Sequence, residues 1–211
     1  MTCPLCTADA QFYFRDEKLD RRYFRCAICD LRFLDPAKHL AASEELARYE
    51  LHKNDITDVR YQDYMRPIAD WIQTRTTFRS HGLDFGCGKA ALLAQMLNAK
   101  NYEMQIFDPY YCPDKTYQTK KYDFCVAVET AEHFYSPSYE FGHLKGLLKD
   151  TGGLGIVTAL FHANINFSSW YYRLDPTHVC FYSTRTFDWI KCELGFLHYE
   201  TDGIRLNWLS R

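Results

Sequence analysis

The pattern of apolar and polar positions changes three times along the 211 residues of the chain. Two short apolar stretches within residues 11–25, separated by a polar turn, predict small strands. Residues 58–74 carry apolar side chains at helical spacing, so a helix is expected there. Further on, strand-length runs at 83–85 and 103–108 enclose a predicted helix at 90–97, and this order indicates an α/β domain.

The pattern of residues 36–79 predicts a helical linker between the N-terminal strands and the α/β part. Ser43 is expected to cap a first helix, and a polar break separates it from the helix at 58–74. His52 and Asn54 in this break precede the α/β part and are predicted to fold over its ligand as a lid that contacts substrate. The face of the second helix that is expected to pack on the α/β part consists of Tyr61, Tyr64, Ile68, Trp71 and Ile72.

Four cysteines near the start of the chain form two CxxC pairs, Cys3 with Cys6 and Cys26 with Cys29. Thiolates at this spacing can surround one tetrahedral ion, so the sequence predicts a structural zinc (Zn2+) ribbon over residues 1–35. A redox dithiol is the alternative, but one ion explains two matched pairs better. The metal would offset the small core of so short a segment. Ribbons also serve as docking surfaces, so a recognition role stays open.

The main chemical signal is the run Asp84-Phe85-Gly86-Cys87-Gly88 at the end of the first predicted strand of the α/β part. Two glycines remove side chains where backbone approaches a ligand, and Asp84 can bind an ammonium group. Asp108 ends the next strand and can accept both hydroxyls of a ribose. A carboxylate at position 84 would repel a pyrophosphate, so this turn favours a ligand without phosphate over a dinucleotide.

This acid–glycine–acid pattern resembles motif I and the ribose-binding acid of class I S-adenosylmethionine-dependent methyltransferases. Residues 122–129 look like the fourth strand of that family, and the following Glu129 to His133 resembles its E-x-x-EH segment. Asp175-Pro-Thr-His-Val resembles a loop of a bacterial methyltransferase group that carries a zinc ribbon. The resemblance covers essentially the whole chain and implies a doubly wound, Rossmann-like sheet over residues 80–211.

The resemblance also implies roles for individual residues. Three base candidates could activate a methyl acceptor: His133, His178 and Asp175. His133 could instead order its loop, and His178 could be a buried histidine bonded to Asp175 or to a carbonyl. The aromatic segment 161–172 follows the fifth strand and suggests acceptor contacts from His162, Trp170 and Tyr172, beside His52 and Asn54. The expected S-adenosylmethionine (S-adenosyl-L-methionine) contacts are Tyr61, Asp84, Phe85, Gly86, Cys87, Gly88, Phe107, Asp108, Pro109 and Glu129.

One departure from the family layout concerns its third strand. Only fourteen residues separate Asp108 from Asp123, which is too few for a helix, a strand and another helix. We therefore expect the third strand to be missing or vestigial. The adenine wall would then come from residues 107–111, and the exposed sheet edge would be covered by the ribbon or by a second subunit, which leaves a homodimer open.

Charge and composition restrict the kinds of partner that the chain is expected to bind. The formal net charge is -2 and no basic stripe stands out, which argues against nucleic acid. No apolar run is long enough to cross a membrane, and the start of the chain shows no secretory signal, so a cytoplasmic protein is expected. The aromatic walls favour a small-molecule methyl acceptor. The alternatives are an RNA or protein acceptor docked by the ribbon, and a non-catalytic cofactor-binding module.

Overall fold

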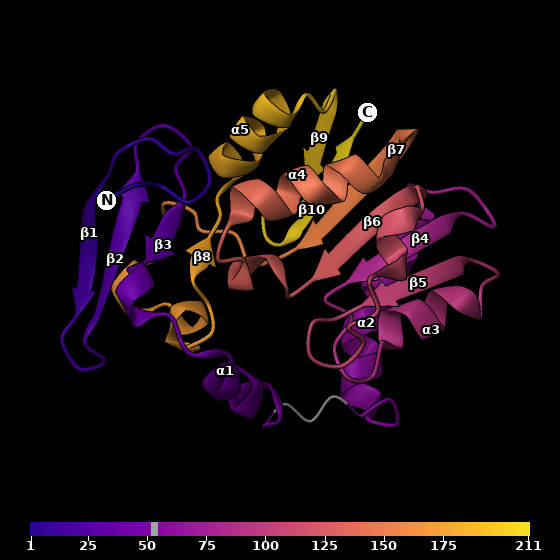
Figure 1. The fold of residues 1–211 in the computed structure, drawn as a ribbon, viewed down its shortest axis with the longest axis horizontal. Helices are drawn as coiled ribbons and strands as arrows, with labels where there is room; N and C mark the ends of the chain where they lie inside the picture. The colour runs from indigo at the N-terminus through magenta and orange to yellow at the C-terminus, as the bar shows by residue number, and fades with distance from the viewer. Residues whose placement is uncertain (52–54) are drawn as a thin grey trace.

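A six-stranded sheet forms the centre of the computed structural model, which describes residues 1–51 and 55–211 (Figure 1). Its strand order is β5-β4-β6-β7-β10-β9, with parallel pairing from β5 to β7 and antiparallel pairing beyond. The parallel strands are β4 (His81–Phe85), β5 (Glu103–Phe107), β6 (Tyr122–Val128) and β7 (Leu148–Val157). The closing strands are β9 (His198–Thr201) and β10 (Leu206–Ser210), as expected for the end of the chain.

Helices cover both faces of this sheet because the central strand β6 is apolar on both sides. Phe124, Val126 and Val128 pack under α2 (Val59–Gln73) and α3 (Leu92–Asn98). Cys125 and Ala127 face α4 (Pro137–Leu147) and α5 (Thr184–Leu194) on the other side. Among the helices within the described residues, none combines the length and the apolar character needed to cross a bilayer.

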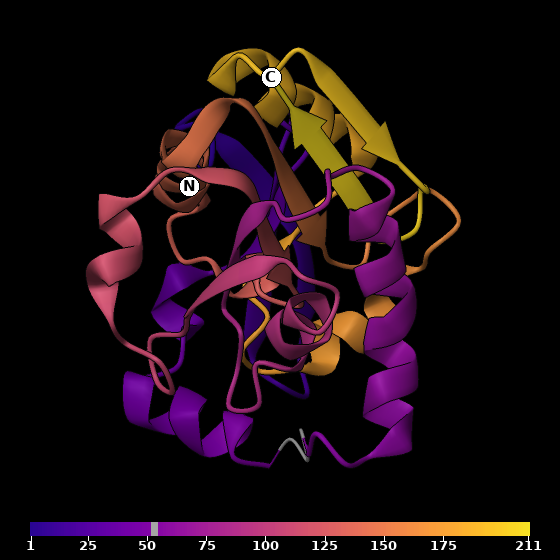
Figure 2. The same cartoon turned by 90° about the vertical axis from the view of Figure 1, so that its right-hand side faces the viewer.

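Side-chain caps begin two of the main helices. Asp58 caps α2 through the backbone nitrogen of Arg60 at 2.9 Å, and Ser183 caps α5. The predicted cap at Ser43 is wrong: α1 (Ala42–Tyr49) already begins before it, and its N-cap is Ala41. Helix α3 begins later than predicted because Ala91 adopts a left-handed conformation, with φ 44°. In Figure 2, α1 and α2 lie at the same end of the molecule.

The predicted loss of the third strand is confirmed for residues 109–121, all of which the structure describes. They contain the short 3-10 helix η2 (Lys115–Thr119) and no strand. Tyr117 of η2 packs its ring 4.5 Å from that of Phe107 on the edge strand β5. The ribbon does not cover this edge, contrary to one expectation, since β1 to β3 lie at the opposite end of the molecule (Figure 1).

The cysteine-bearing segment forms its own sheet, but the last strand of that sheet comes from far along the chain. The order is β1-β2-β3-β8, all antiparallel, with β1 (Ala10–Asp16), β2 (Arg21–Cys26), β3 (Arg32–Leu34) and β8 (Cys180–Phe181). The amide of Leu34 also donates to the carbonyl of Val179 at 2.9 Å. The N-terminal segment and the C-terminal half therefore share a sheet and one hydrophobic core.

Gly153 on β7 lies under the indole of Trp208, and a Cβ atom there would meet Trp208 at 2.1 Å. Trp208 is buried, so the ring has little room to move. We expect Gly153→Ala to lower the free energy of unfolding by about 1–3 kcal/mol through overpacking. Urea unfolding followed by circular dichroism measures this change.

The matched control is Gly142→Ala in α4, where a Cβ would meet nothing within 4 Å. Alanine in an open helical position should leave stability unchanged or raise it by up to about 1 kcal/mol. Equal unfolding midpoints for Gly153→Ala and the natural chain would contradict the packing described.

Candidate functional site

A cavity of about 970 Å³ opens at the carboxyl ends of β4, β5 and β6. This volume lies near the upper end of the usual range for small-ligand sites, about 300–1,000 Å³. The ten residues predicted to contact a cofactor all line it, and so do the three predicted base candidates. The structure therefore brings together groups that lie far apart in the sequence.

The glycine turn after β4 forms the floor of the cavity. Gly86 and Gly88 adopt positive φ angles of 78° and 64°, and a Cβ on Gly86 would lie 2.3 Å from Thr130. Position 86 thus requires glycine, and the positive φ at position 88 favours it. Asp84 beside the turn is almost fully buried, and burial raises its pKa to about 7, with a smaller contribution from Asp108. Burial favours the neutral form of this carboxyl group, and a cationic group of a ligand beside it would favour the ionised form instead. Asp84 is therefore suited to bind a cationic group.

Asp108 organises the next wall of the cavity. One carboxylate oxygen accepts a hydrogen bond from the Gly88 amide at 3.0 Å, and the other accepts from the amides of Tyr110 and Tyr111 at 2.9 and 3.0 Å. A carboxylate has about four acceptor sites, so these three bonds fix Asp108 and still leave it able to accept from a ligand. Asp108 thus locks the glycine turn to the segment after β5.

Glu129 sits at the end of β6 in a left-handed conformation, with φ 47°, which is costly for a residue other than glycine. Its Oε1 accepts from the Tyr64 hydroxyl at 2.7 Å, and its Oε2 lies 3.0 Å from the Tyr172 hydroxyl. Burial and the neighbouring Glu132 raise the pKa of Glu129 to about 8. The strained backbone therefore places a carboxyl group of high proton affinity at the cavity wall.

Glu132 lies behind this wall and is fully buried. Its Oε1 is 2.5 Å from the Tyr172 hydroxyl, and its Oε2 accepts from the hydroxyl of Thr158 at 3.0 Å. Burial raises its pKa. Glu132 was not among the predicted site residues, although it is the second glutamate of the E-x-x-EH segment at Glu129 to His133.

Two histidines face each other across the cavity wall with ring centres 4.9 Å apart. His133 places Nδ1 2.9 Å from the Thr177 carbonyl, and His178 places Nδ1 2.7 Å from the Tyr172 carbonyl. A carbonyl only accepts, so each Nδ1 carries the proton and each Nε2 carries a lone pair. Burial lowers the pKa of His133, which favours this neutral form. The expected carbonyl bond of His178 is thus present, and its ring still lines the cavity.

Asp175 has a different character from the histidines. Its oxygens accept from Arg48 at 2.7 Å and from the amide and hydroxyl of Thr177 at 3.0 and 2.7 Å. Burial alone would raise the pKa of Asp175, but these donors hold it well below its usual range. A carboxylate that stays ionised so firmly is a poor proton acceptor, so the geometry favours a positioning role over the predicted role as base.

Helix α1 supplies cavity residues that sequence reasoning missed. Glu45 accepts from the hydroxyls of Tyr49 and Tyr110 at 2.9 and 2.5 Å, and Arg48 pairs with Asp175. Their spacing of three and four residues on one helix face was the available signal. Through these bonds α1 joins the segment after β5 to the histidine loop.

The predicted acceptor contacts divide into four groups. Tyr172 lines the cavity, whereas Trp170 is buried behind it with ring centres 5.2 Å apart, and His162 is exposed outside the cavity. The reason is that the aromatic segment turns toward the N-terminal sheet: Phe167 packs on Tyr13, Phe14 and Tyr23 with ring centres 5.2–5.8 Å apart. The expected acceptor wall is mainly an internal interface. His52 and Asn54 lie outside the described residues.

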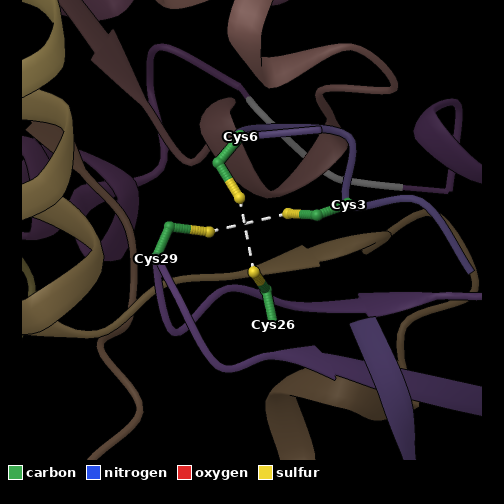
Figure 3. A group of neighbouring side chains, drawn as sticks. All are labelled: Cys3, Cys6, Cys26 and Cys29. Carbon is green, nitrogen blue, oxygen red and sulfur yellow. Dashed lines mark hydrogen bonds between the residues drawn. The ribbon is translucent and has the colours of Figure 1, made fainter. Parts of the chain in front are cut away.

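The four N-terminal cysteines point their sulfur atoms at one another (Figure 3). Cys3 and Cys29 have their sulfurs 3.5 Å apart, those of Cys6 and Cys26 are 3.3 Å apart, and all four lie within 4.8 Å of one another. Zinc–sulfur bonds of about 2.3 Å place tetrahedral sulfurs about 3.8 Å apart. The cluster is therefore geometrically consistent with a zinc site.

Comparisons with known proteins agree with this geometry. A family model described as a methyltransferase domain matches residues 54–199. A search of curated proteins found no match. The fold is similar to those of an O-methyltransferase family protein from Burkholderia thailandensis (15% identity, TM-score 0.55, covering 79% of this chain and 62% of that one) and a methyltransferase from Archaeoglobus fulgidus, named as dependent on S-adenosylmethionine (19%, 0.53, 66% and 70%).

A third similar structure is the 1,6-didemethyltoxoflavin-N1-methyltransferase of Burkholderia thailandensis, with bound 1,6-didemethyltoxoflavin and S-adenosylhomocysteine. It is 14% identical, with a TM-score of 0.53, and the match covers 95% of this chain and 97% of that one. The chain thus spans 62% of the first structure's length and nearly all of this one. At these identities the likeness is one of fold, and it confirms the predicted Rossmann-like α/β class.

Proposed function

We propose that this chain, which belongs to the methyltransferase domain family, is an S-adenosylmethionine-dependent enzyme whose methyl acceptor is a small organic molecule. The observation that supports this most is the pairing of Asp84 and Asp108 across the glycine turn of one cavity. When bound, S-adenosylmethionine supplies an electrophilic methyl group to a nucleophile placed in line with it.

The residues present fit this cofactor. Asp84 would hold its ammonium group and Asp108 its ribose hydroxyls. Because Gly86 has no Cβ, the glycine turn can pack closely against Thr130 on the cavity wall. Phe85, Phe107 and Pro109 offer apolar surface for the adenine, which a third strand would otherwise help to enclose. No phosphate-binding group is needed, in keeping with the acidic character of the turn.

The other half of the cavity has the features of a small acceptor site. Its walls include the aromatic side chains of Tyr49, Tyr64 and Tyr172, and α1 encloses one side. We propose that His133 and His178 activate the acceptor through the lone pairs on Nε2, which can take up a proton or bind a cation. Asp175 positions their loop through Arg48 and Thr177.

The division of the chain follows from the same proposal. Residues 1–35 would form a structural zinc ribbon held by Cys3, Cys6, Cys26 and Cys29, of the ribbon-bearing methyltransferase group. In the linker over residues 36–79, helices α1 and α2 would cover the cavity, and residues 80–211 would carry the catalytic sheet. Since β8 completes the ribbon sheet, the proposed role of the metal is to support the loop that bears His178.

Calorimetric titration of the cofactor-free protein with S-adenosylhomocysteine tests the proposal. We expect binding of one ligand per chain, with affinity rising about tenfold between pH 5.5 and 7. The reason is that a pKa of about 7 leaves Asp84 mostly protonated at the lower pH, while the ligand's ammonium requires the ionised form. Absence of binding would refute the proposed function, and binding that ignores pH would refute only the role of Asp84.

A further inference from the structure

Glu132, His133 and His178 offer ligand atoms that lie within 4.8 Å of one another at the back of the cavity. We propose that these three side chains bind a divalent transition-metal ion, which activates a hydroxyl group of the acceptor. This inference rests on the proposed function, since it assigns the chemistry of the same cavity. It makes the reaction an O-methylation.

The orientation of the histidines supports metal binding. Histidines that bind metals usually donate their other ring N–H to a carbonyl or carboxylate, which fixes the ring. Both rings do this here, through Nδ1 to the carbonyls of Thr177 and Tyr172. The Nε2 atoms are then the ligand atoms, and two imidazoles with one carboxylate form a common donor set for such ions.

The hydrogen bonds around Tyr172 support the metal site independently. The Tyr172 hydroxyl lies within hydrogen-bond distance of Glu129 at 3.0 Å and of Glu132 at 2.5 Å. It has a single hydrogen, so it can donate to only one of the two carboxylates. Within the described residues neither carboxylate has an ion pair with a basic side chain. A bound cation can take the place of a shared proton in offsetting the charge of this buried pair.

The position of the site defines the class of acceptor. Three protein ligands leave further coordination positions open, and His133 and His178 direct these toward the cavity. An acceptor hydroxyl bound there would release its proton to water at lower pH than it does in solution. Its oxygen then forms the new bond to the methyl carbon, while the carbon–sulfur bond breaks and its electron pair stays on sulfur. Phenols and enols with a neighbouring oxygen fit best, because they can chelate the ion.

Mn²⁺ binding, followed by loss of the free-ion electron paramagnetic resonance signal, tests the site in the full chain with its zinc retained. Mn²⁺ is the weakest competitor for thiolates among these ions, so it does not report on the cysteine cluster. We expect one Mn²⁺ per chain, and at least about tenfold weaker binding in both His178→Ala and Glu132→Gln. The control His162→Ala changes an exposed histidine outside the cavity and should bind Mn²⁺ like the natural chain.

Titration of the same samples with S-adenosylhomocysteine separates the possible failures. A variant that has lost Mn²⁺ but still binds this ligand is folded, so its loss counts as support. The metal site is refuted if the natural chain binds no Mn²⁺ below about 1 mM, or if both ligand variants bind it unchanged. If Mn²⁺ binding fails while S-adenosylhomocysteine binds, the proposed function stands and the histidines act as direct proton acceptors.

Discussion

Replacing Asp84 by alanine is expected to lower the affinity for S-adenosylhomocysteine at least about a hundredfold, which corresponds to about 2.7 kcal/mol. The variant loses the only carboxylate that the glycine turn places inside the cavity for the ligand's ammonium, and Asp84 is too deeply buried for water to replace it. Calorimetry at pH 7.5 measures the loss. Circular dichroism establishes that the fold persists.

Two further variants sharpen this test. Asp84→Asn keeps the size of the side chain but removes its charge, so it should also bind weakly and lose the pH dependence expected of the natural chain. Asp150→Ala removes a fully exposed carboxylate on β7, outside the cavity, and should bind normally. If Asp84→Asn binds as tightly as the natural protein, charge at this position does not hold the ligand.

Removing the proposed zinc ion should have a comparably large effect on stability. Zinc binding contributes about 10–16 kcal/mol to the folding of small zinc-finger peptides. This is as large as the whole free energy of unfolding of a typical domain, about 5–15 kcal/mol. We expect Cys26→Ser to lower the melting temperature by roughly 10 °C or more and to abolish zinc binding. Methyl transfer should fall as well, since β3 holds β8 and the neighbouring histidine loop in place.

Zinc content and thermal unfolding measured together test this expectation. Cys192→Ser provides the matched control, because Cys192 is exposed and stands apart from the cluster. A natural protein that contains no zinc, or that keeps its melting temperature after chelation, would show that the four thiols need no ion.

Local signals in the sequence predicted the backbone that forms the floor of the cavity. A strand followed by Gly86 and Gly88 predicts a tight turn, because glycine readily adopts the positive φ angles that such a turn needs. Asp108 follows the next strand at the same sheet edge. The short connection between Asp108 and Asp123 predicted the missing strand by length alone. In each case residues close in sequence decide the structure.

Contacts between distant segments could not be predicted in this way. Strand β8 has two residues, too few for any periodicity, and it is defined only by pairing with β3. The bond from Arg48 to Asp175 joins segments 127 residues apart. The aromatic segment that ends at Tyr172 was predicted to contact the acceptor. Aromatic side chains suit a ligand pocket and a protein interface equally well, and only the packing against the ribbon shows which of these the segment forms. Whether the chain forms a homodimer stays a prediction.

The shared ribbon sheet also bears on how the chain folds as it is made. Translation proceeds from the N-terminus, so β1, β2 and β3 leave the ribosome long before their partner β8 at Cys180–Phe181. Until then the edge of β3 has unpaired backbone groups, and such an edge can pair with other chains. The nascent chain therefore passes through an aggregation-sensitive stage that ends only after Cys180–Phe181 have been synthesised.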